Sequence, residues 1–104
     1  MLKLPVISAA VVIATIGGAH ADPATGAMLS AQICARCHAV RPGLTSSPQA
    51  DAPPFATIAA KPEMNIFTLM SYLRTPHWTS ANLSLRAPDI EAVSSYIMSL
   101  QPKK

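Results

Sequence analysis

The segment Cys34-Ala35-Arg36-Cys37-His38 (CARCH) decides how this chain folds and what it holds. Its two thiols are three positions apart, and an imidazole follows the second thiol directly. Cysteines with this spacing occur in three kinds of site: a redox dithiol, a zinc site and an attachment site for haem. The segment alone is compatible with each of them, so the rest of the chain has to distinguish among the three.

Two of these interpretations need features that the sequence lacks. A thioredoxin-like dithiol lies next to a βαβ unit, but no segment here alternates between apolar and polar residues for long enough to predict a strand. A structural zinc site needs four ligands, usually as two separated pairs. Beyond residue 21, the available Cys and His side chains are Cys34, Cys37, His38 and His77. Adjacent Cys37 and His38 rarely share one tetrahedral ion.

The haem interpretation agrees with the motif. In Cys-x-x-Cys-His the two thiols add across the two vinyl groups of haem, and one helical turn separates the thiols by a matching distance. The histidine then offers its imidazole to the iron from one face. We therefore expect one covalently bound haem c, with Cys34 and Cys37 as the two thioether anchors and His38 as the proximal iron ligand.

Residues 1–21 have the features of a secretory signal peptide. Lys3 precedes an apolar run from Leu4 to Ile16, and Ala19-His20-Ala21 provides a small-x-small cleavage site. The run is shorter than the roughly 20 residues that a membrane-spanning helix needs. We expect cleavage after Ala21 and a periplasmic mature domain of residues 22–104. An uncleaved membrane anchor is the alternative, and only then would the protein contact a membrane.

The composition predicts one small domain with few large side chains for its core. Aromatic residues make up 5% of the chain, charged residues 12%, and the net charge is +3. A domain of about 80 residues is near the size at which apolar packing alone becomes marginal. A large flat cofactor would supply the missing hydrophobic interior. No clustered basic stripe is present, so we expect no nucleic-acid partner.

Helical patterns occur in three segments. Asp22-Pro23 opens the first, which delivers Cys34 at its end, and Gly26 there permits close contact with another helix. Lys61-Pro62-Glu63 opens the second, which ends near Arg74. The third begins at Pro88 and stops before Pro102.

The segment of residues 39–60 is predicted to be a long loop. Its prolines exclude a continuous helix or a central strand. In so small a domain, a loop of this length would wrap a cofactor. The connection of residues 75–87 is a second long loop. We therefore expect an all-α architecture of three helices and two long loops.

Short motifs along the chain resemble those of the small monohaem class I cytochromes c of bacteria. They are Ser47-Pro48, Ala52-Pro53-Pro54-Phe55, Thr75-Pro76-His77 and Leu83-Ser84-Leu85, together with the haem motif. The resemblance implies three main helices around one haem, with the first and last crossing. It also implies that the His38 ring donates a hydrogen bond to the carbonyl of Pro53 or Pro54.

One position departs from that family. Class I cytochromes usually complete the iron coordination with a methionine from the loop before the last helix. In the resembled subgroup the loop reads T-P-H-x-x-M-P, and here the positions of Met and the second Pro hold Ser80 and Ala81. No methionine lies between Thr75 and Ala87.

Several groups could take the sixth position instead. His77 lies in the right loop and imidazole is a strong iron ligand, so we assign it to the distal position. Its other role would be a hydrogen bond in the loop or a contact with a haem propionate. The alternatives that stay open are Met64, Met70, the amide of Asn82 and no strong protein ligand.

Two functions follow from these expectations. The first is a periplasmic carrier that moves single electrons between redox proteins during transient docking, without catalysing a reaction. The second is a haem protein whose vacant or weakly ligated distal site binds or senses small molecules. In that case the distal pocket would be lined by His77, Trp78, Thr79 and Ser80. Arg41, Arg74 and Arg86 are each candidates to pair with a haem propionate, and the alternative for each is a solvated arginine on the surface.

Overall fold

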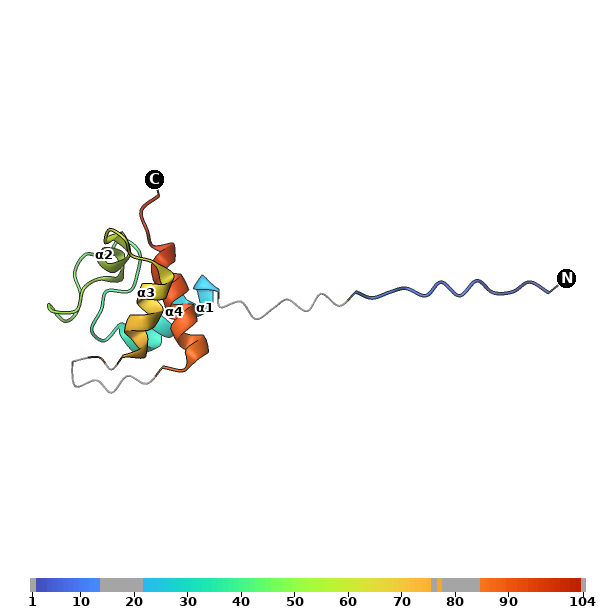
Figure 1. The fold of residues 1–104 in the computed structure, drawn as a ribbon, viewed down its shortest axis with the longest axis horizontal. Coiled ribbons are helices and arrows are strands. Elements are labelled where there is room, and N and C mark those ends of the chain that lie inside the picture. Colours follow the sequence, from blue (N-terminus) through green and yellow to red (C-terminus); the bar gives the residue numbers. More distant parts are fainter. Residues whose placement is uncertain (1, 14–21, 76, 78–84, 104) are drawn as a thin grey trace.

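The computed structural model describes residues 2–13, 22–75, 77 and 85–103. These contain four α-helices and one π-helical turn, and no strand is found among them. In chain order the elements are α1 (Pro23–Leu29), η1 (Ser30–Cys34), α2 (Phe55–Ala60), α3 (Ile66–Arg74) and α4 (Ala87–Ser99). The all-α prediction is confirmed (Figure 1), and this helical architecture agrees with the cytochrome c fold that the resemblance implies.

The first helix begins where the sequence predicts. The Asp22 side chain accepts a hydrogen bond of 2.7 Å from the backbone N–H of Thr25, and Pro23 occupies the first turn. This hydrogen bond lowers the pKa of Asp22. The helix then widens into η1, where the Ala35 N–H donates to the Ser30 carbonyl over 3.0 Å. The chain therefore reaches Cys34 without leaving the helix.

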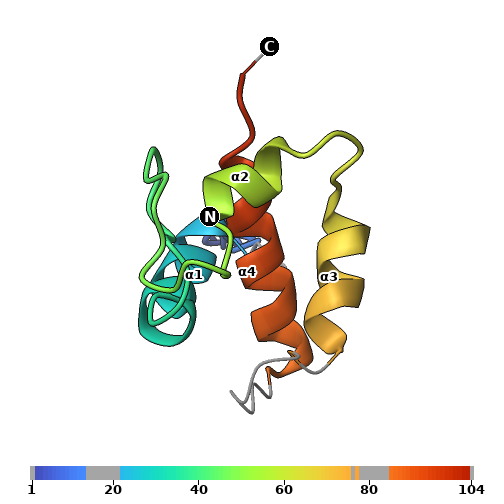
Figure 2. The same cartoon turned by 90° about the vertical axis from the view of Figure 1, so that its left-hand side faces the viewer.

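Helix α4 is the centre of the domain. Figure 2 shows α1 and α3 on opposite sides of it and α2 across one end. Six of its 13 residues are buried: Ile90, Ala92, Val93, Ser94, Tyr96 and Ile97. The Tyr96 hydroxyl donates a hydrogen bond of 2.6 Å to the Val40 carbonyl. This bond fastens the long loop after the CARCH segment to α4.

Helices α1 and α4 touch at Gly26. A Cβ atom on Gly26 would overlap the Ala92 carbonyl oxygen and lie 2.7 Å from the Tyr96 Cβ. The Ala92 carbonyl group belongs to the backbone, which cannot move aside as a flexible side chain would. The absence of a side chain at position 26 thus sets how closely the first and last helices approach.

The second predicted helix begins later than expected. It starts at Ile66 rather than near Lys61, because the Asn65 side chain caps it by accepting a 3.0 Å hydrogen bond from the Thr68 N–H. Glu63 has a φ of 67°, in the left-handed region, which no α-helical residue adopts. Met64 consequently lies in a turn and not in a helix.

The loop prediction for residues 39–60 is also wrong in part. Residues 55–60 form α2, which is fixed by burial of Phe55 and Ala59 on its inner side. A helix of six residues is too short to show a helical period in the sequence. The residues before α2 have no regular structure, as expected.

Two other expectations concern segments that lie wholly or partly outside the described residues. The connection of residues 75–87 lies largely outside them, including Trp78, Thr79, Ser80 and Asn82. Among the helices that the structure does describe, none combines the length and the apolar character required to cross a membrane. The signal peptide and its cleavage after Ala21 stay predictions.

We predict that Gly26→Ala destabilises the domain. Forcing a methyl group against the α4 backbone should cost about 1–3 kcal/mol, more than the up to ~1 kcal/mol that alanine gains over glycine in a helix. Urea unfolding of the purified protein measures the difference. Met28→Ala, at an exposed position of the same helix, is the matched control and should be near neutral. Equal stability of the Gly26→Ala variant and the parent would contradict this account of the crossing.

Candidate cofactor site

A cavity of about 610 Å³ lies between the end of η1, the loop before α2, and the inner faces of α2 and α3. This volume is within the roughly 300–1,000 Å³ usual for small-molecule and cofactor sites. Its walls are mainly apolar, and the larger apolar side chains that line it are Ile33, Phe55, Ile58, Met64, Leu69, Leu73 and Ile97. A large group of low polarity would therefore be stabilised here.

All four site residues expected from the sequence line this one cavity: Cys34, Cys37, His38 and His77. Helix geometry brings the first three together, because Cys34 ends η1 and the His38 N–H donates to the Cys34 carbonyl over 3.0 Å. His77 belongs to a different segment, three residues after the end of α3. The structure thus brings together residues that are about 40 positions apart in the sequence.

His38 is oriented by a backbone carbonyl. Its Nδ1 lies 2.7 Å from the Pro53 carbonyl oxygen. Because a carbonyl oxygen only accepts, Nδ1 carries the proton and donates, and in the neutral ring Nε2 keeps its lone pair. The family resemblance left Pro53 and Pro54 as alternatives, and the structure selects Pro53. The Phe55 ring, 5.4 Å from the His38 ring between centroids, packs beside it.

The loop that carries Pro53 is held in place at several points. The buried Ala39 N–H donates to the Ser47 hydroxyl over 2.9 Å, and the Gln49 N–H donates to the Cys37 carbonyl over 3.1 Å. The Phe55 N–H donates to the Ala39 carbonyl over 2.9 Å. These bonds fold the loop back on the CARCH segment, which places the Pro53 carbonyl opposite His38.

The two cysteines are free thiols. Burial raises the pKa of Cys34 to about 11, so it is protonated at neutral pH. A redox dithiol needs a thiolate as its nucleophile, and zinc binds thiolates. In the part of the chain that the structure describes, no group of three or more His, Cys, Asp or Glu side chains is arranged to hold a metal ion. The raised pKa of Cys34 argues against a redox dithiol, and the lack of such a group of side chains argues against a zinc site.

His77 is half-buried and faces His38. The two ring centroids are 6.3 Å apart with the ring planes at 75°. Burial, and secondarily the positive charge of a protonated His38, lowers the pKa of His77. A neutral imidazole retains a lone pair that can bind a metal.

The remaining candidate ligands and propionate partners differ in whether they line the cavity. Met64 lines the cavity, whereas Met70 is absent from its described walls. The described walls also lack the three arginines considered as propionate partners, Arg41, Arg74 and Arg86. The cations that do line the cavity are Arg36 and Lys61. Sequence reasoning missed them, although Arg36 lies within the CARCH segment itself.

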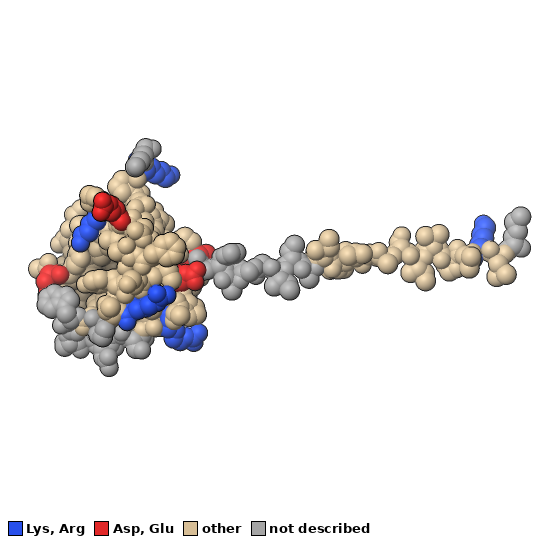
Figure 3. Space-filling model, viewed as in Figure 1, with Lys and Arg blue, Asp and Glu red and all other residues tan. Residues whose placement is uncertain are grey.

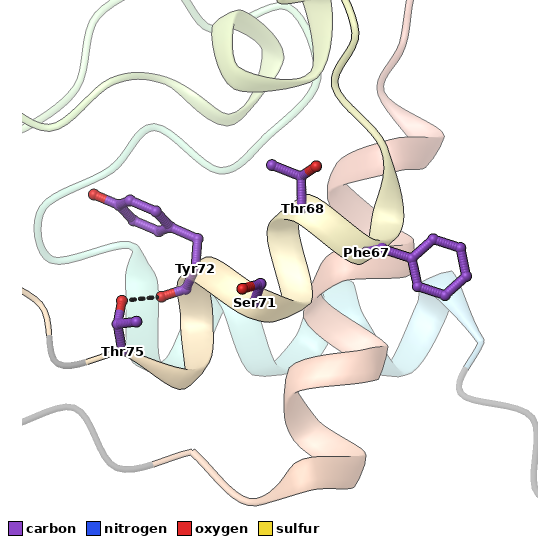
Figure 4. A pocket seen from close by; sticks show the side chains of 5 residues that line it. All are labelled: Phe67, Thr68, Ser71, Tyr72 and Thr75. Atoms are coloured by element: carbon purple, nitrogen blue, oxygen red, sulfur yellow. Dashed lines mark hydrogen bonds between the residues drawn. The ribbon is translucent and has the colours of Figure 1, made fainter.

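A second, shallower depression lies on the outer side of α3. Figure 4 shows its lining residues, which are Phe67, Thr68, Ser71, Tyr72 and Thr75. Thr68 and Tyr72 also line the main cavity. The depression has none of the thiol or imidazole groups, so we place the cofactor site in the main cavity.

The comparisons with known proteins agree with this geometry. The chain is 34% identical over 82 residues to the protein named cytochrome c-552 of Bradyrhizobium diazoefficiens, and the match covers 79% of this chain and 78% of that protein. The chain is a c-type cytochrome. No family model matches this cytochrome. No solved structure matches it either.

Membership of this family makes the cytochrome an electron-transfer protein that carries haem c. Its residues fit that group. Two thiols, one imidazole with an oriented lone pair and a large apolar cavity lie in one place. Nothing in the described donor set favours another cofactor.

We predict that Ser47→Ala loosens the cavity wall. It removes the acceptor of the buried Ala39 N–H, and an unsatisfied buried donor costs about 1–3 kcal/mol. Ser46→Ala changes an exposed neighbouring hydroxyl and should cost less than about 0.5 kcal/mol. Chemical denaturation of both variants in the haem-loaded form measures the difference. If both serines can be replaced at equal cost, the bond does not hold the loop.

Proposed function

We propose that this cytochrome is exported to the periplasm and carries single electrons between redox proteins. The observation that carries the proposal is the convergence of Cys34, Cys37 and His38 on one apolar cavity, with the His38 ring oriented by Pro53. Bound haem supplies an iron that alternates between the ferric and ferrous states, one electron at a time. The chain's own residues bind that group, orient it and limit its access to water.

Each of the three residues has a separate role in this proposal. Cys34 and Cys37 would form the two thioethers, which would keep the haem attached when the fold opens locally. His38 would hold the iron through its Nε2 lone pair. The hydrogen bond from Nδ1 to Pro53 prevents the ring from turning and makes it a better electron donor.

His77 is the proposed second residue that would hold the haem iron. Two imidazoles that bind one metal from opposite sides, each at the ~2 Å metal–nitrogen distance usual for histidine, have ring centroids about 6 Å apart. The observed 6.3 Å between the His38 and His77 centroids agrees with such a pair. Exchange of the usual methionine for a histidine would also lower the reduction potential, because methionine ligation raises it.

The surface agrees with brief contacts between proteins. Figure 3 shows charged side chains of both signs scattered over one face, with uncharged surface between them. Weak redox encounters use small interfaces. We therefore propose transient docking near the cavity mouth, with redox proteins as partners.

An absorption spectrum tests the proposal. The protein is purified from a host that matures c-type cytochromes, and ferric and ferrous spectra are recorded with and without carbon monoxide. We expect one haem, retained after denaturation through Cys34 and Cys37, in a low-spin form that resists the gas. Replacing either cysteine by alanine should leave haem joined by one thioether, which shifts the pyridine haemochrome band.

The role of His77 is tested separately. His77→Ala should turn the haem high-spin and let the ferrous form bind carbon monoxide. Arg74→Ala, an exposed change at the end of α3, is the control and should leave the spectrum unaltered. An unchanged low-spin spectrum in His77→Ala would exclude His77 as the ligand.

The same spectra decide on the second candidate function. It is motivated by the absence of methionine between Thr75 and Ala87 in the sequence. If the parent protein is already high-spin and takes up carbon monoxide at once, the distal site is open. Binding or sensing of small ligands would then replace electron transfer as the proposal.

A further inference from the structure

The last turn of α3 is built around Tyr72. The Tyr72 carbonyl accepts two hydrogen bonds from Thr75, one of 2.6 Å from its hydroxyl and one of 3.1 Å from its backbone N–H (Figure 4). These bonds close the helix and fix the direction in which the chain leaves it. His77 follows Thr75 by two residues, so this turn determines where the following segment starts.

The Tyr72 side chain also contacts His77 directly. The two rings are 6.2 Å apart between centroids, with their planes at 68°. This edge-to-face arrangement is one of the two that aromatic pairs favour. Both rings line the main cavity, and the His77 ring is at nearly the same distance, 6.3 Å, from the His38 ring.

Tyr72 is not explained by packing in the core. Its side chain is 58% exposed in the chain, and it is absent from the buried cluster around α4. Its neighbour Leu69 on the same helix is 5% exposed and does belong to that cluster. A role in holding the domain together therefore falls to Leu69 rather than to Tyr72.

We propose that Tyr72 is a positioning residue that holds the His77 ring where it can bind the iron. The inference rests on the proposed function, because it needs a haem in the cavity and His77 beside it. The ring of Tyr72 does the holding, and its hydroxyl has no hydrogen bond to any residue that the structure describes. Loss of the ring would let His77 turn or move away more often, which opens the distal position.

The expected size of the effect follows from the contact. An edge-to-face aromatic pair shifts an equilibrium by roughly two- to tenfold. The fraction of molecules with His77 dissociated should increase by that factor when the ring is removed. Since carbon monoxide binds only to the dissociated form, its uptake rate should rise by the same factor.

Three variants of the haem-loaded full chain test the inference: Tyr72→Leu, Tyr72→Phe and Phe67→Leu. Tyr72→Leu removes the ring, whereas Tyr72→Phe keeps it and removes only the hydroxyl. Phe67→Leu is the matched control, because Phe67 is an exposed aromatic residue on the same helix that contributes to the outer depression only. Carbon monoxide uptake by the ferrous protein, the high-spin fraction of the ferric protein and the reduction potential are measured for each.

Uptake by Tyr72→Leu should be roughly two- to tenfold faster than uptake by the parent, with a larger high-spin fraction. Tyr72→Phe and Phe67→Leu should match the parent. If Tyr72→Leu matches the parent as well, the inference is wrong while the proposed function stands. If Phe67→Leu shows the same increase, the cause is general loosening of α3, and the inference is also overturned. A parent protein without haem would instead refute the proposed function.

Discussion

The hydrogen bond between the His38 ring and the Pro53 carbonyl joins the two walls of the cavity. One wall is the end of the first helix with the CARCH segment, and the other is the proline-rich loop. At 2.7 Å the bond fixes the ring against that loop and leaves Nε2 for a metal. The proposed binding of a metal by His38 depends on this orientation, because a ring free to rotate would not present one nitrogen to the cavity.

The rest of the fold keeps these two walls at the correct separation. Gly26 lets α1 approach α4 at the backbone, and Tyr96 on α4 holds the loop through Val40. The interior that results is nevertheless small. Its buried aromatic residues are Phe55 and Tyr96 in the described part of the chain, and a cavity of about 610 Å³ occupies the space between the helices. Haem would fill that space and make apolar contacts with its walls. We therefore expect haem binding to contribute to the stability of the folded chain.

Much of the fold was predictable from the sequence because short stretches of residues determine where its helices begin and how closely they pack. The Asp22-Pro23 start, the small residue at Gly26 and the start of the last helix at Pro88 are each local signals, and all three are confirmed. The motif predicted that Cys34, Cys37 and His38 lie together, and the structure brings them to one cavity. Whether they bind haem in the proposed roles stays a prediction.

The errors concern short segments whose conformation tertiary contacts decide. Helix α2 has six residues and forms because Phe55 is buried under α4, which no periodicity could reveal. The start of α3 depended on whether Pro62 or Asn65 begins the helix, and the Asn65 side-chain cap decided it. Arg36 and Lys61 were missed as cavity-lining cations because exposure to a cavity depends on the arrangement of three separate elements.

The central claim is that haem supplies the interior that this short polypeptide lacks. Far-ultraviolet circular dichroism during urea unfolding, recorded for the haem-loaded protein and for the same chain produced without haem, tests it most directly. The account predicts a cooperative transition for the haem-loaded protein and, for the haem-free chain, reduced helix content without a cooperative transition. A haem-free chain with the full helix content and an equally cooperative transition at the same urea concentration would contradict it.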